Sequence, residues 1–273
     1  MRRVVLLATV LAIALPTAAH AVWGGQQDTA HPGVGAIYFD FSGNGTITAD
    51  ELICSGSYAG RSKSGANDVF LTAGHCLPPA DAGIPANEVF VSFDGDGRNG
   101  VTGLIALSSY FQMPGFGRDA GDARDLGILL LPAGSVPAGT PAVRLPVAGY
   151  LDQLKAAGTL KFRIADIVGY GVIPIWDPPG RTQFAFDGVR RAGTSTIIGL
   201  DNADLHFTQN RNGNGTGSGL CFGDSGSPQL DRGTLLVLSV TSGGNGQCNS
   251  NNQNYRVDTP LARAFLGQFL RLP

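Results

Sequence analysis

Charged side chains are scarce in this chain of 273 residues, since Asp, Glu, Lys and Arg make up 15% of it. The 19 basic residues nearly balance the 21 acidic ones, which leaves a formal net charge of −2. Without a basic excess there is no electrostatic attraction to nucleic acid or to an anionic membrane, so neither is expected as a partner. Long apolar runs are also missing beyond residue 21, so we expect no membrane-spanning helix in the mature chain.

The first 21 residues have the pattern of a secretory signal peptide. Arg2 and Arg3 form a positive n-region, and an apolar run covers residues 4–15. Ala19-His20-Ala21 then matches the small-x-small pattern at which signal peptidase cleaves. A membrane anchor is the alternative, but this run is too short to span about 30 Å of hydrocarbon. The pattern predicts a protein secreted to the periplasm or beyond the cell, with residues 22–273 as its mature domain.

Cysteine is rare, and the chain contains four: Cys54, Cys76, Cys221 and Cys248. No two of them have the C-x-x-C spacing of a structural zinc site. In an oxidising compartment an even number of cysteines predicts disulfides, and three pairings are possible for four residues. Proximity in the sequence favours Cys54 with Cys76 and Cys221 with Cys248. Each bond would stabilise the fold by roughly 3 kcal/mol, because it restricts the unfolded chain.

Glycine and proline are abundant by contrast, with 40 and 16 residues. They separate short apolar runs of the length of β-strands. The runs cover residues 34–39, 52–55, 69–72, 89–93, 126–131, 164–169 and 235–241. Such spacing is typical of an antiparallel sandwich or barrel. We expect the polar stretches 201–219 and 243–254 to form long surface loops, which often carry function.

The C-terminal segment has helical periodicity instead. Thr259 can cap the helix, and Pro260 suits the first helical position. The apolar residues at helical spacing are Leu261, Phe265, Leu266, Phe269 and Leu270. The pattern predicts a helix with one face packed on the body.

Ser225 stands between glycines in the segment Gly223-Asp224-Ser225-Gly226. The glycines allow a tight turn that exposes the hydroxyl and lets the amides of Gly223 and Ser225 converge. Two such amides form an oxyanion hole, and loss of one donor typically costs about 10²–10³ in rate. The alternative is an ordinary Gly-Ser turn.

A serine hydroxyl becomes a strong nucleophile when an adjacent base takes its proton. His75 is the candidate base, because His20 lies in the signal peptide and His31 and His206 lie in polar segments. Asp125 directly precedes an apolar run, where a partly buried carboxylate needs a partner such as an imidazole N–H. The alternatives are a structural histidine beside a disulfide and an aspartate that caps a strand end.

Because these residues occur in the order His75, Asp125, Ser225, the chain resembles the chymotrypsin/trypsin family of serine peptidases. The similarity covers nearly the whole mature chain. Its further segments are Thr72-Ala73-Gly74-His75-Cys76, Gly169-Tyr170-Gly171, Ser242-Gly243-Gly244 and the C-terminal helix. The resemblance implies an all-β fold of two six-stranded antiparallel β-barrels and a C-terminal helix, with the catalytic triad in the cleft between the barrels. It also implies peptide hydrolysis through an acyl-enzyme, and it supports both cysteine pairings.

The resemblance further assigns the residues that would bind substrate. Ser242 would donate a hydrogen bond to Asp125, and Ser242, Gly243 and Gly244 would hold the substrate backbone as an added strand.

It also implies a specificity pocket with Gly219 at its base, Gly244 at an open mouth and Gln253 near the floor. No carboxylate is present at the base, so we expect an uncharged substrate side chain there. On this interpretation Gly219→Asp would shift the preference toward Arg or Lys.

In the resembled family, a new α-amine folds inward and pairs with the aspartate just before the nucleophile. Cleavage after Ala21 would create that amine on Val22, and the partner would be Asp224. The sequence therefore predicts an enzyme that is active once the signal peptide is removed, with no further propeptide. Trp23 and Ser227 depart from the family pattern, where a smaller apolar residue and a glycine are usual.

Residues 40–51 fit the twelve-residue calcium loop of an EF-hand. The expected ligands are Asp40, Ser42, Asn44 and Glu51 through their side chains and Thr46 through its carbonyl. The flanking runs are strand-like rather than helical, so a polar hairpin insertion is the alternative. No other cofactor is expected.

Two further functions share the same motifs. A catalytically silent homologue would bind partners through this fold, although such proteins usually lose a triad residue. An esterase or acyl transferase would use the same triad. We expect a monomer that acts on protein or peptide substrates.

Overall fold

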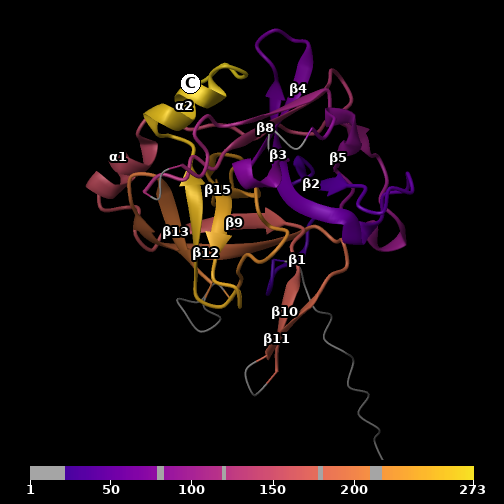
Figure 1. Ribbon diagram of the computed structural model, residues 1–273. Coiled ribbons are helices and arrows are strands. Elements are labelled where there is room, and N and C mark those ends of the chain that lie inside the picture. Colours follow the sequence, from indigo (N-terminus) through magenta and orange to yellow (C-terminus); the bar gives the residue numbers. More distant parts are fainter. Residues whose placement is uncertain (1–21, 79–82, 119–120, 178–180, 210–216) are drawn as a thin grey trace, which may run out of the picture.

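Two β-sheets built from the two halves of the chain lie against each other (Figure 1). The structure is a computed structural model, and it describes residues 22–78, 83–118, 121–177, 181–209 and 217–273. The predicted signal peptide, residues 1–21, lies outside the described residues. In the part of the chain that is described, no helix is long and apolar enough to cross a membrane.

The first sheet contains seven antiparallel strands in the order β6-β5-β2-β3-β4-β8-β7. They are β2 (Val34–Phe39), β3 (Leu52–Arg61), β4 (Asn67–Thr72), β5 (Val89–Ser92), β6 (Ile105–Ala106), β7 (Ser109–Gln112) and β8 (Gly127–Pro132). Short 3-10 helices occupy its connections: η1 (Ala49–Glu51), η2 (Gly74–Cys76), η3 (Ala86–Glu88) and η4 (Gly97–Asn99). The sheet curves into a half-barrel whose edge strands are β6 and β7.

The second sheet runs in the order β1-β12-β13-β16-β15-β14-β9, and an additional pairing of β12 with β9 closes the ring. Its strands are β1 (Gln26–Gln27), β9 (Ile164–Gly169), β12 (Arg191–Leu200), β13 (Asp204–Thr208), β14 (Pro228–Asp231), β15 (Val237–Gly244) and β16 (Asn251–Arg256). With β1 outside the ring, the closed barrel has six strands. The predicted all-β architecture of two barrel-like sheets is therefore confirmed, with one difference: the first sheet is a half-barrel of seven strands, where a six-stranded barrel was predicted.

Two predicted surface loops are wrong in part. Within the expected loop 201–219 the chain forms β13, and within 243–254 it forms the end of β15 and the start of β16. In β16 the fully buried Asn254 is satisfied inside the barrel, since its amide donates to the carbonyl of Leu205 of β13 at 3.1 Å. Hydrophobic alternation, the usual sign of a strand, is weak in β16, where the buried positions include Asn252 and Asn254; in the short β13 it is limited to Leu205 and Phe207.

The two sheets are joined by buried polar contacts as well as by a shared apolar core. Arg190, just before β12, donates from Nη1 to the carbonyls of Val34 and Phe93 in the first half, each at 3.1 Å. It also pairs with the buried carboxylate of Asp28 at 3.0 Å. The fully buried Tyr170 donates its hydroxyl to the Asp94 carbonyl at 2.8 Å, and burial raises the pKa of this phenol to about 12. These hydrogen bonds fix the position of one half of the protein relative to the other.

The C-terminal helix is confirmed as α2 (Pro260–Leu266), and a second helix, α1 (Tyr150–Ala156), precedes β9. Thr259 is the N-cap, and its hydroxyl accepts from the N–H of Ala262 at 3.2 Å. Beyond the helix, Phe269 packs on Phe111 of β7 with ring centroids 5.0 Å apart. The C-terminus thus returns to the first sheet, as Figure 1 shows.

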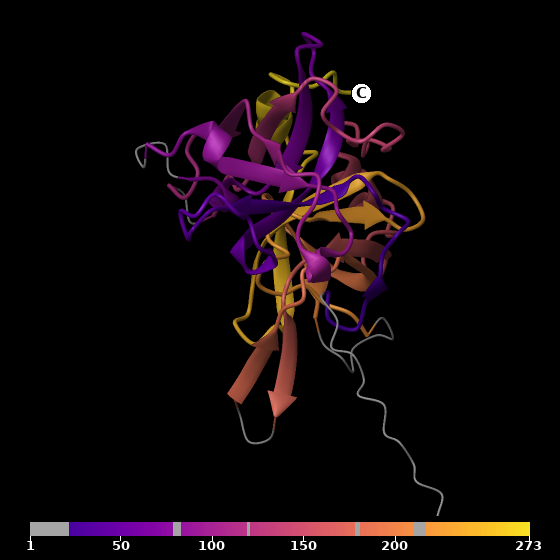
Figure 2. The ribbon, with the colours of Figure 1, turned by 90° about the vertical axis from the view of Figure 1, so that its right-hand side faces the viewer.

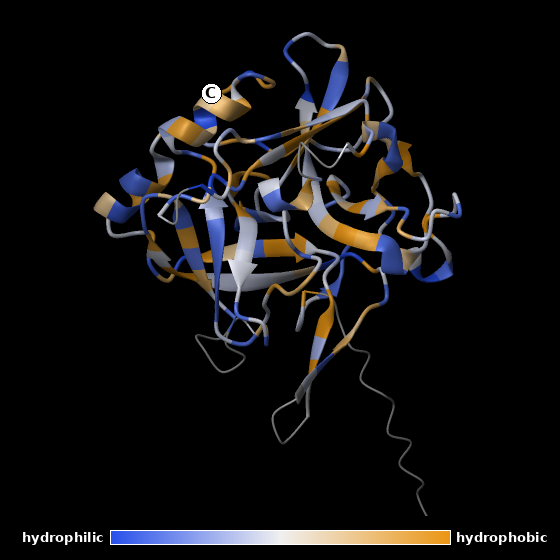
Figure 3. Ribbon diagram, in the orientation of Figure 1, coloured by the Kyte–Doolittle hydropathy of each residue, from blue (hydrophilic) through white to orange (hydrophobic). Residues whose placement is uncertain are grey.

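A hairpin of β10 (Ile173–Asp177) and β11 (Arg181–Ala185) extends away from both sheets (Figure 2). Apolar residues lie along it (Figure 3), and Ile175 and Phe184 are exposed. The ring of Phe184 contacts that of Phe222 edge to face at 5.3 Å, so the base of the hairpin lies beside the 221–228 segment.

Candidate active site

His75 and Asp125 are brought together by the pairing of β4 with β8. Thr72 at the end of β4 pairs with Gly127 at the start of β8, so the segments beyond these residues emerge side by side. One carboxylate oxygen of Asp125 accepts the backbone N–H of His75 at 2.8 Å, and the other lies 2.8 Å from the imidazole Nδ1. This double contact sets both the backbone and the ring of His75.

The carboxylate of Asp125 is almost wholly buried, with 2% of the residue exposed. Ser242 of β15 donates its hydroxyl to the same oxygen that faces the imidazole, as the sequence predicted. The side chain of His75 is 33% exposed and reaches the surface of the cleft. Three donors therefore satisfy a buried negative charge whose burial unpaired would be costly.

Ser225 lies on a turn that glycine makes possible. Gly223 and Gly226 have φ values of +90° and +82°, a region that L side chains rarely adopt. A Cβ on Gly226 would lie 2.0 Å from the hydroxyl oxygen of Thr72. The carbonyl of Ser225 accepts the N–H of Ser55 at 2.8 Å, which fixes the turn against β3.

Ser55 holds the same turn through its side chain, a role that no sequence motif suggested. Its buried hydroxyl donates to the carbonyl of Gly223 at 2.8 Å and accepts the N–H of Tyr170 at 3.1 Å. The N–H groups of Gly223 and Ser225 have no hydrogen-bond acceptor among the described residues. They remain available to a developing oxyanion.

A pocket of about 360 Å³ opens beside His75 and Ser225. It is lined by Gln209, Leu220, Cys221, Phe222, Thr241, Ser242, Gly243, Gly244, Asn245, Cys248 and Asn252. Asp, Glu, Lys and Arg are missing from these described lining residues. We call it the Asn252 pocket.

Two buried amides shape the Asn252 pocket. The Nε2 of Gln209 donates to the carbonyl of Leu220, and the Nδ2 of Asn252 donates weakly to Asn254 at 3.4 Å. These bonds orient the amides so that Oε1 of Gln209 and Oδ1 of Asn252 have no hydrogen-bond partner among the described residues. No sequence motif pointed to either residue: Gln209 directly follows β13 and Asn252 lies in β16, and both segments were expected to be surface loops.

Gly219 and Gln253 are not where the sequence suggested. A Cβ on Gly219 would lie 2.4 Å from the Nε1 of Trp23, whose backbone carbonyl accepts the Gly219 N–H at 3.1 Å. The bulky Trp23, which packs on the Cys221–Cys248 disulfide, thus fills the space that a side chain at 219 would need. Asn252, not the exposed Gln253, faces the pocket, because neighbouring strand residues point to opposite sides.

A second hollow of about 420 Å³ lies on the other side of His75 and Ser225. Its walls are Phe39, Phe41, Ile53, Cys54, Cys76, Leu77, Pro78, Ile84, Val89, Phe222 and Gly223. We call it the Phe41 groove. All of these side chains are apolar or belong to a disulfide.

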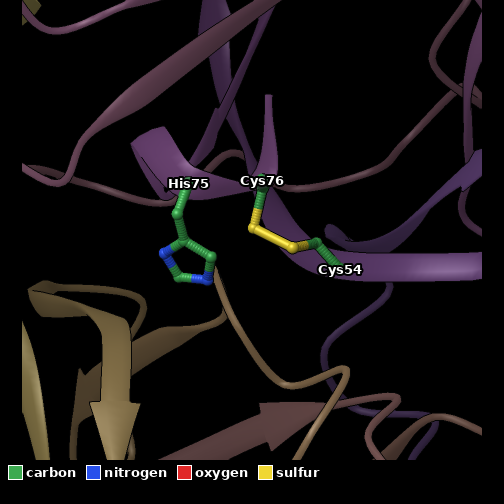
Figure 4. Close-up of side chains that lie close together, drawn as sticks. All are labelled: Cys54, His75 and Cys76. Atoms are coloured by element: carbon green, nitrogen blue, oxygen red, sulfur yellow. A yellow bond between two sulfur atoms is a disulfide. The ribbon is translucent and has the colours of Figure 1, made fainter. Parts of the chain in front are cut away.

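Both predicted disulfides are present, Cys54–Cys76 and Cys221–Cys248. Figure 4 shows His75 beside the first of them. Within the described residues, these three form the one group of histidine, cysteine and acidic side chains close enough to share a metal ion. Because both sulfurs are in the disulfide, the group lacks the thiolates that a metal would bind.

Val22 and Asp224 are both fully buried. Val22 packs on Leu220, next to Cys221, whose N–H donates to the Asp224 carboxylate at 2.9 Å. Gly171 donates a second N–H at 2.8 Å. Burial raises the pKa of Asp224 to about 7, against the two hydrogen bonds, which lower it.

The 40–51 loop joins β2 to β3, as the strand-like flanks predicted. The N–H of Gly45 donates to Asp40 at 2.7 Å and lowers the pKa of that carboxyl group. The carboxylate of Glu51 accepts the N–H of Ser42 at 3.1 Å. The two acidic ends of the loop therefore turn inward over the residues between them.

A sequence model of the trypsin family matches residues 22–266 of the chain. The chain belongs to the trypsin family. This trypsin-family protein is accordingly a serine-type endopeptidase.

Solved structures of the same fold include a collagenase, named HL collagenase, with 15% identity, a TM-score of 0.59 and coverage of 89% of this chain and 96% of the other. The human heparin binding protein has 17% identity, a TM-score of 0.59 and coverage of 89% and 94%. The VesB protease of Vibrio cholerae has 14% identity, a TM-score of 0.59 and coverage of 89% and 65%. A search of curated proteins found no match. The structural similarity establishes the fold, and at such low identities it shows nothing of the chemistry, which depends on the residues of the site.

Proposed function

We propose that this trypsin-family peptidase is a secreted, monomeric endopeptidase that cleaves peptide bonds through an acyl-enzyme on Ser225. The observation that carries the proposal is the imidazole of His75, oriented by buried Asp125 and bordering the same pocket as Ser225. All three residues come from one chain, so no second subunit is needed.

In the proposed reaction, Oγ of Ser225 attacks the carbonyl carbon of the scissile bond while His75 takes the hydroxyl proton. The N–H groups of Gly223 and Ser225 stabilise the oxyanion. His75 then gives the proton to the leaving amine as the C–N bond breaks. Water then attacks the acyl-enzyme by the same steps, with His75 taking its proton. The carboxylic acid is released, and His75 returns the proton to Oγ of Ser225.

Residues 242–244 support binding of the acyl half of the substrate. Ser242, Gly243 and Gly244 line the Asn252 pocket, and the strand that contains them ends at the cleft. An extended peptide can pair with this edge, and its side chain enters the pocket. The pocket suits an uncharged side chain, because its described walls carry only neutral groups and His75.

Ser225→Ala tests the proposed nucleophile. We expect turnover of a peptide substrate to fall by a factor on the order of 10⁶, since removal of the nucleophile of such a triad has that effect. The matched control is Ser227→Ala, because the Ser227 hydroxyl lies 2.9 Å from that of Thr241 and not in the pocket. A Ser225→Ala protein that folds and keeps more than about a thousandth of the activity would refute the assignment.

Asn252→Asp should turn the neutral pocket into one for cations. The substitution is isosteric and places a carboxylate where Oδ1 has no partner, so kcat/KM for cleavage after Arg or Lys should rise by roughly tenfold or more relative to cleavage after Leu. Gln253→Asp is the control, because that neighbour does not line the pocket. Gly219→Asp should fail to convert specificity, since its side chain collides with Trp23. An equal shift in the Gln253→Asp protein would disprove the pocket assignment.

The α-amine of Val22 is proposed to activate the enzyme by pairing with Asp224. Two observations support it: both residues are buried, and the carboxylate has no cation among the described residues. Its hydrogen bonds to Cys221 and Gly171 link it to the backbone on either side of the oxyanion hole. Ionisation of Asp224 would therefore be coupled to the geometry of that hole.

The pH dependence of stability separates the two forms. In a chain extended before Val22, the raised pKa of Asp224, about 7, keeps the native carboxyl protonated while the unfolded one ionises near 3.9. The contribution of Asp224 to the free energy of unfolding is then fully present below about pH 4 and is lost as the pH rises to about 7. In the chain that begins at Val22, the protonated amine pairs with the ionised carboxylate of Asp224. The contribution of this pair to stability is lost as the pH rises past the raised pKa of the amine, above about 8.

We therefore expect the melting temperatures of the two forms to diverge between pH 4 and pH 7. Asp224→Asn should remove the divergence. The extended form should also lose most of its peptidase activity. Superimposable pH profiles with equal activity would show that the amine is not used.

We also propose that the 40–51 loop binds calcium, supported by the inward turn of Asp40 and Glu51. Calcium at millimolar concentration should raise the melting temperature by mass action, as expected for an extracellular site with a Kd of about 10⁻⁴–10⁻³ M. Glu51→Gln should abolish the rise, whereas Asp50→Asn, outside the ligand set, should keep it. Calorimetry without heat of binding at millimolar calcium would eliminate the site.

A further inference from the structure

The Phe41 groove contains large apolar side chains that water reaches freely. Phe41 is 66% exposed and Phe222 is 55% exposed. Both line the same hollow as His75 and Ser225. Isolated exposed apolar residues are common, but a continuous apolar surface at a reactive centre indicates a binding site.

Two of the aromatic rings that line the groove pack on neighbouring rings. Phe41 packs edge to face on Phe39 with centroids 4.9 Å apart, and its N–H donates to the Phe39 carbonyl at 2.9 Å. Phe222 packs edge to face on Phe184 at 5.3 Å. Each ring is thus packed on a neighbouring ring, which restricts its motion before a ligand binds.

The position of the groove identifies which half of the substrate it receives. The Asn252 pocket lies by the Cys221–Cys248 disulfide and by residues 242–244, where the acyl half binds. The Phe41 groove lies by the Cys54–Cys76 disulfide, and the two hollows share His75, Phe222 and Ser225. A peptide that passes over Ser225 from the pocket therefore continues into the groove. His75, which gives its proton to the leaving amine, borders that continuation.

We infer that the Phe41 groove binds a large apolar side chain of the leaving-group half, so that the enzyme prefers peptide bonds followed by Leu, Ile, Met or Phe. The inference rests on the proposed acyl-enzyme mechanism. Burial of one such side chain removes enough apolar surface from water to favour it over glycine by at least tenfold. Charged side chains are disfavoured, because the described walls of the groove carry no Asp, Glu, Lys or Arg and are otherwise apolar apart from His75 and Ser225.

Acyl transfer measures this selectivity directly. An ester substrate with an uncharged acyl side chain forms the acyl-enzyme, and an added amino-acid amide competes with water for it. The amine nitrogen attacks the acyl carbon, the new C–N bond forms, the C–Oγ bond to Ser225 breaks, and His75 passes the proton from the amine to Oγ. The ratio of amide product to acid product reports occupancy of the groove.

We expect leucinamide and phenylalaninamide to give product ratios at least tenfold above those of glycinamide and glutamic acid amide at equal concentration. Phe41→Ala should reduce the advantage of phenylalaninamide over glycinamide several-fold, and Phe41→Leu should retain most of it. Phe162→Ala is the matched control, since Phe162 is 60% exposed and does not line the groove. Its product ratios should equal those of the wild type.

The outcomes distinguish the inference from the mechanism on which it rests. Ester hydrolysis with the same product ratio for every amide would overturn the groove assignment and leave the acyl-enzyme in place. A wild-type protein that hydrolyses neither ester nor peptide would overturn the proposed mechanism, and the groove assignment with it. A preference that Phe41→Ala and Phe41→Leu leave intact would place the selectivity elsewhere and also overturn the inference.

Discussion

The hydrogen bonds to the buried carboxylate of Asp125 are the contacts on which the geometry of the site depends. Its oxygens receive the backbone and ring of His75 from the first sheet and the hydroxyl of Ser242 from the second. A buried charge is stable only when hydrogen-bond donors surround it. The two sheets must therefore pack in one relative position to supply these donors. That requirement places the imidazole at the cleft, where it borders both hollows.

Ser55 also connects the first sheet to the second half of the chain. It belongs to the first sheet, yet its hydroxyl and N–H hold the carbonyls of Gly223 and Ser225 in the second half. Together with the buried Arg190, these bonds link the sheets where apolar packing alone would tolerate sliding. The turn that contains Gly223 and Ser225 is therefore positioned by the interface between the barrels as much as by its own glycines.

The two hollows differ because the strands around them bury different chemistry. The Asn252 pocket is lined by backbone, a disulfide and neutral amides, whereas the Phe41 groove is lined by aromatic and aliphatic side chains. Trp23 adds a third element, since its ring occupies the space beneath Gly219. The two hollows thus differ in the chemistry of their walls although both border His75 and Ser225.

The sequence by itself determined the features that depend on neighbouring residues. The glycines around Ser225, the cap at Thr259 and the cysteines close in the sequence each reflect a local constraint, and the structure contains the turn, the helix and both disulfides. The order of the His75, Asp125 and Ser225 motifs was enough to indicate the family and its two barrels.

Only the tertiary structure decided which side chains line the cleft. Asn252 and Gln253 are adjacent and chemically alike, and the barrel alone selects the one that faces inward. Strand β16 has a polar sequence, and its buried Asn254 finds its partner across the barrel on β13; such long-range satisfaction leaves no local pattern.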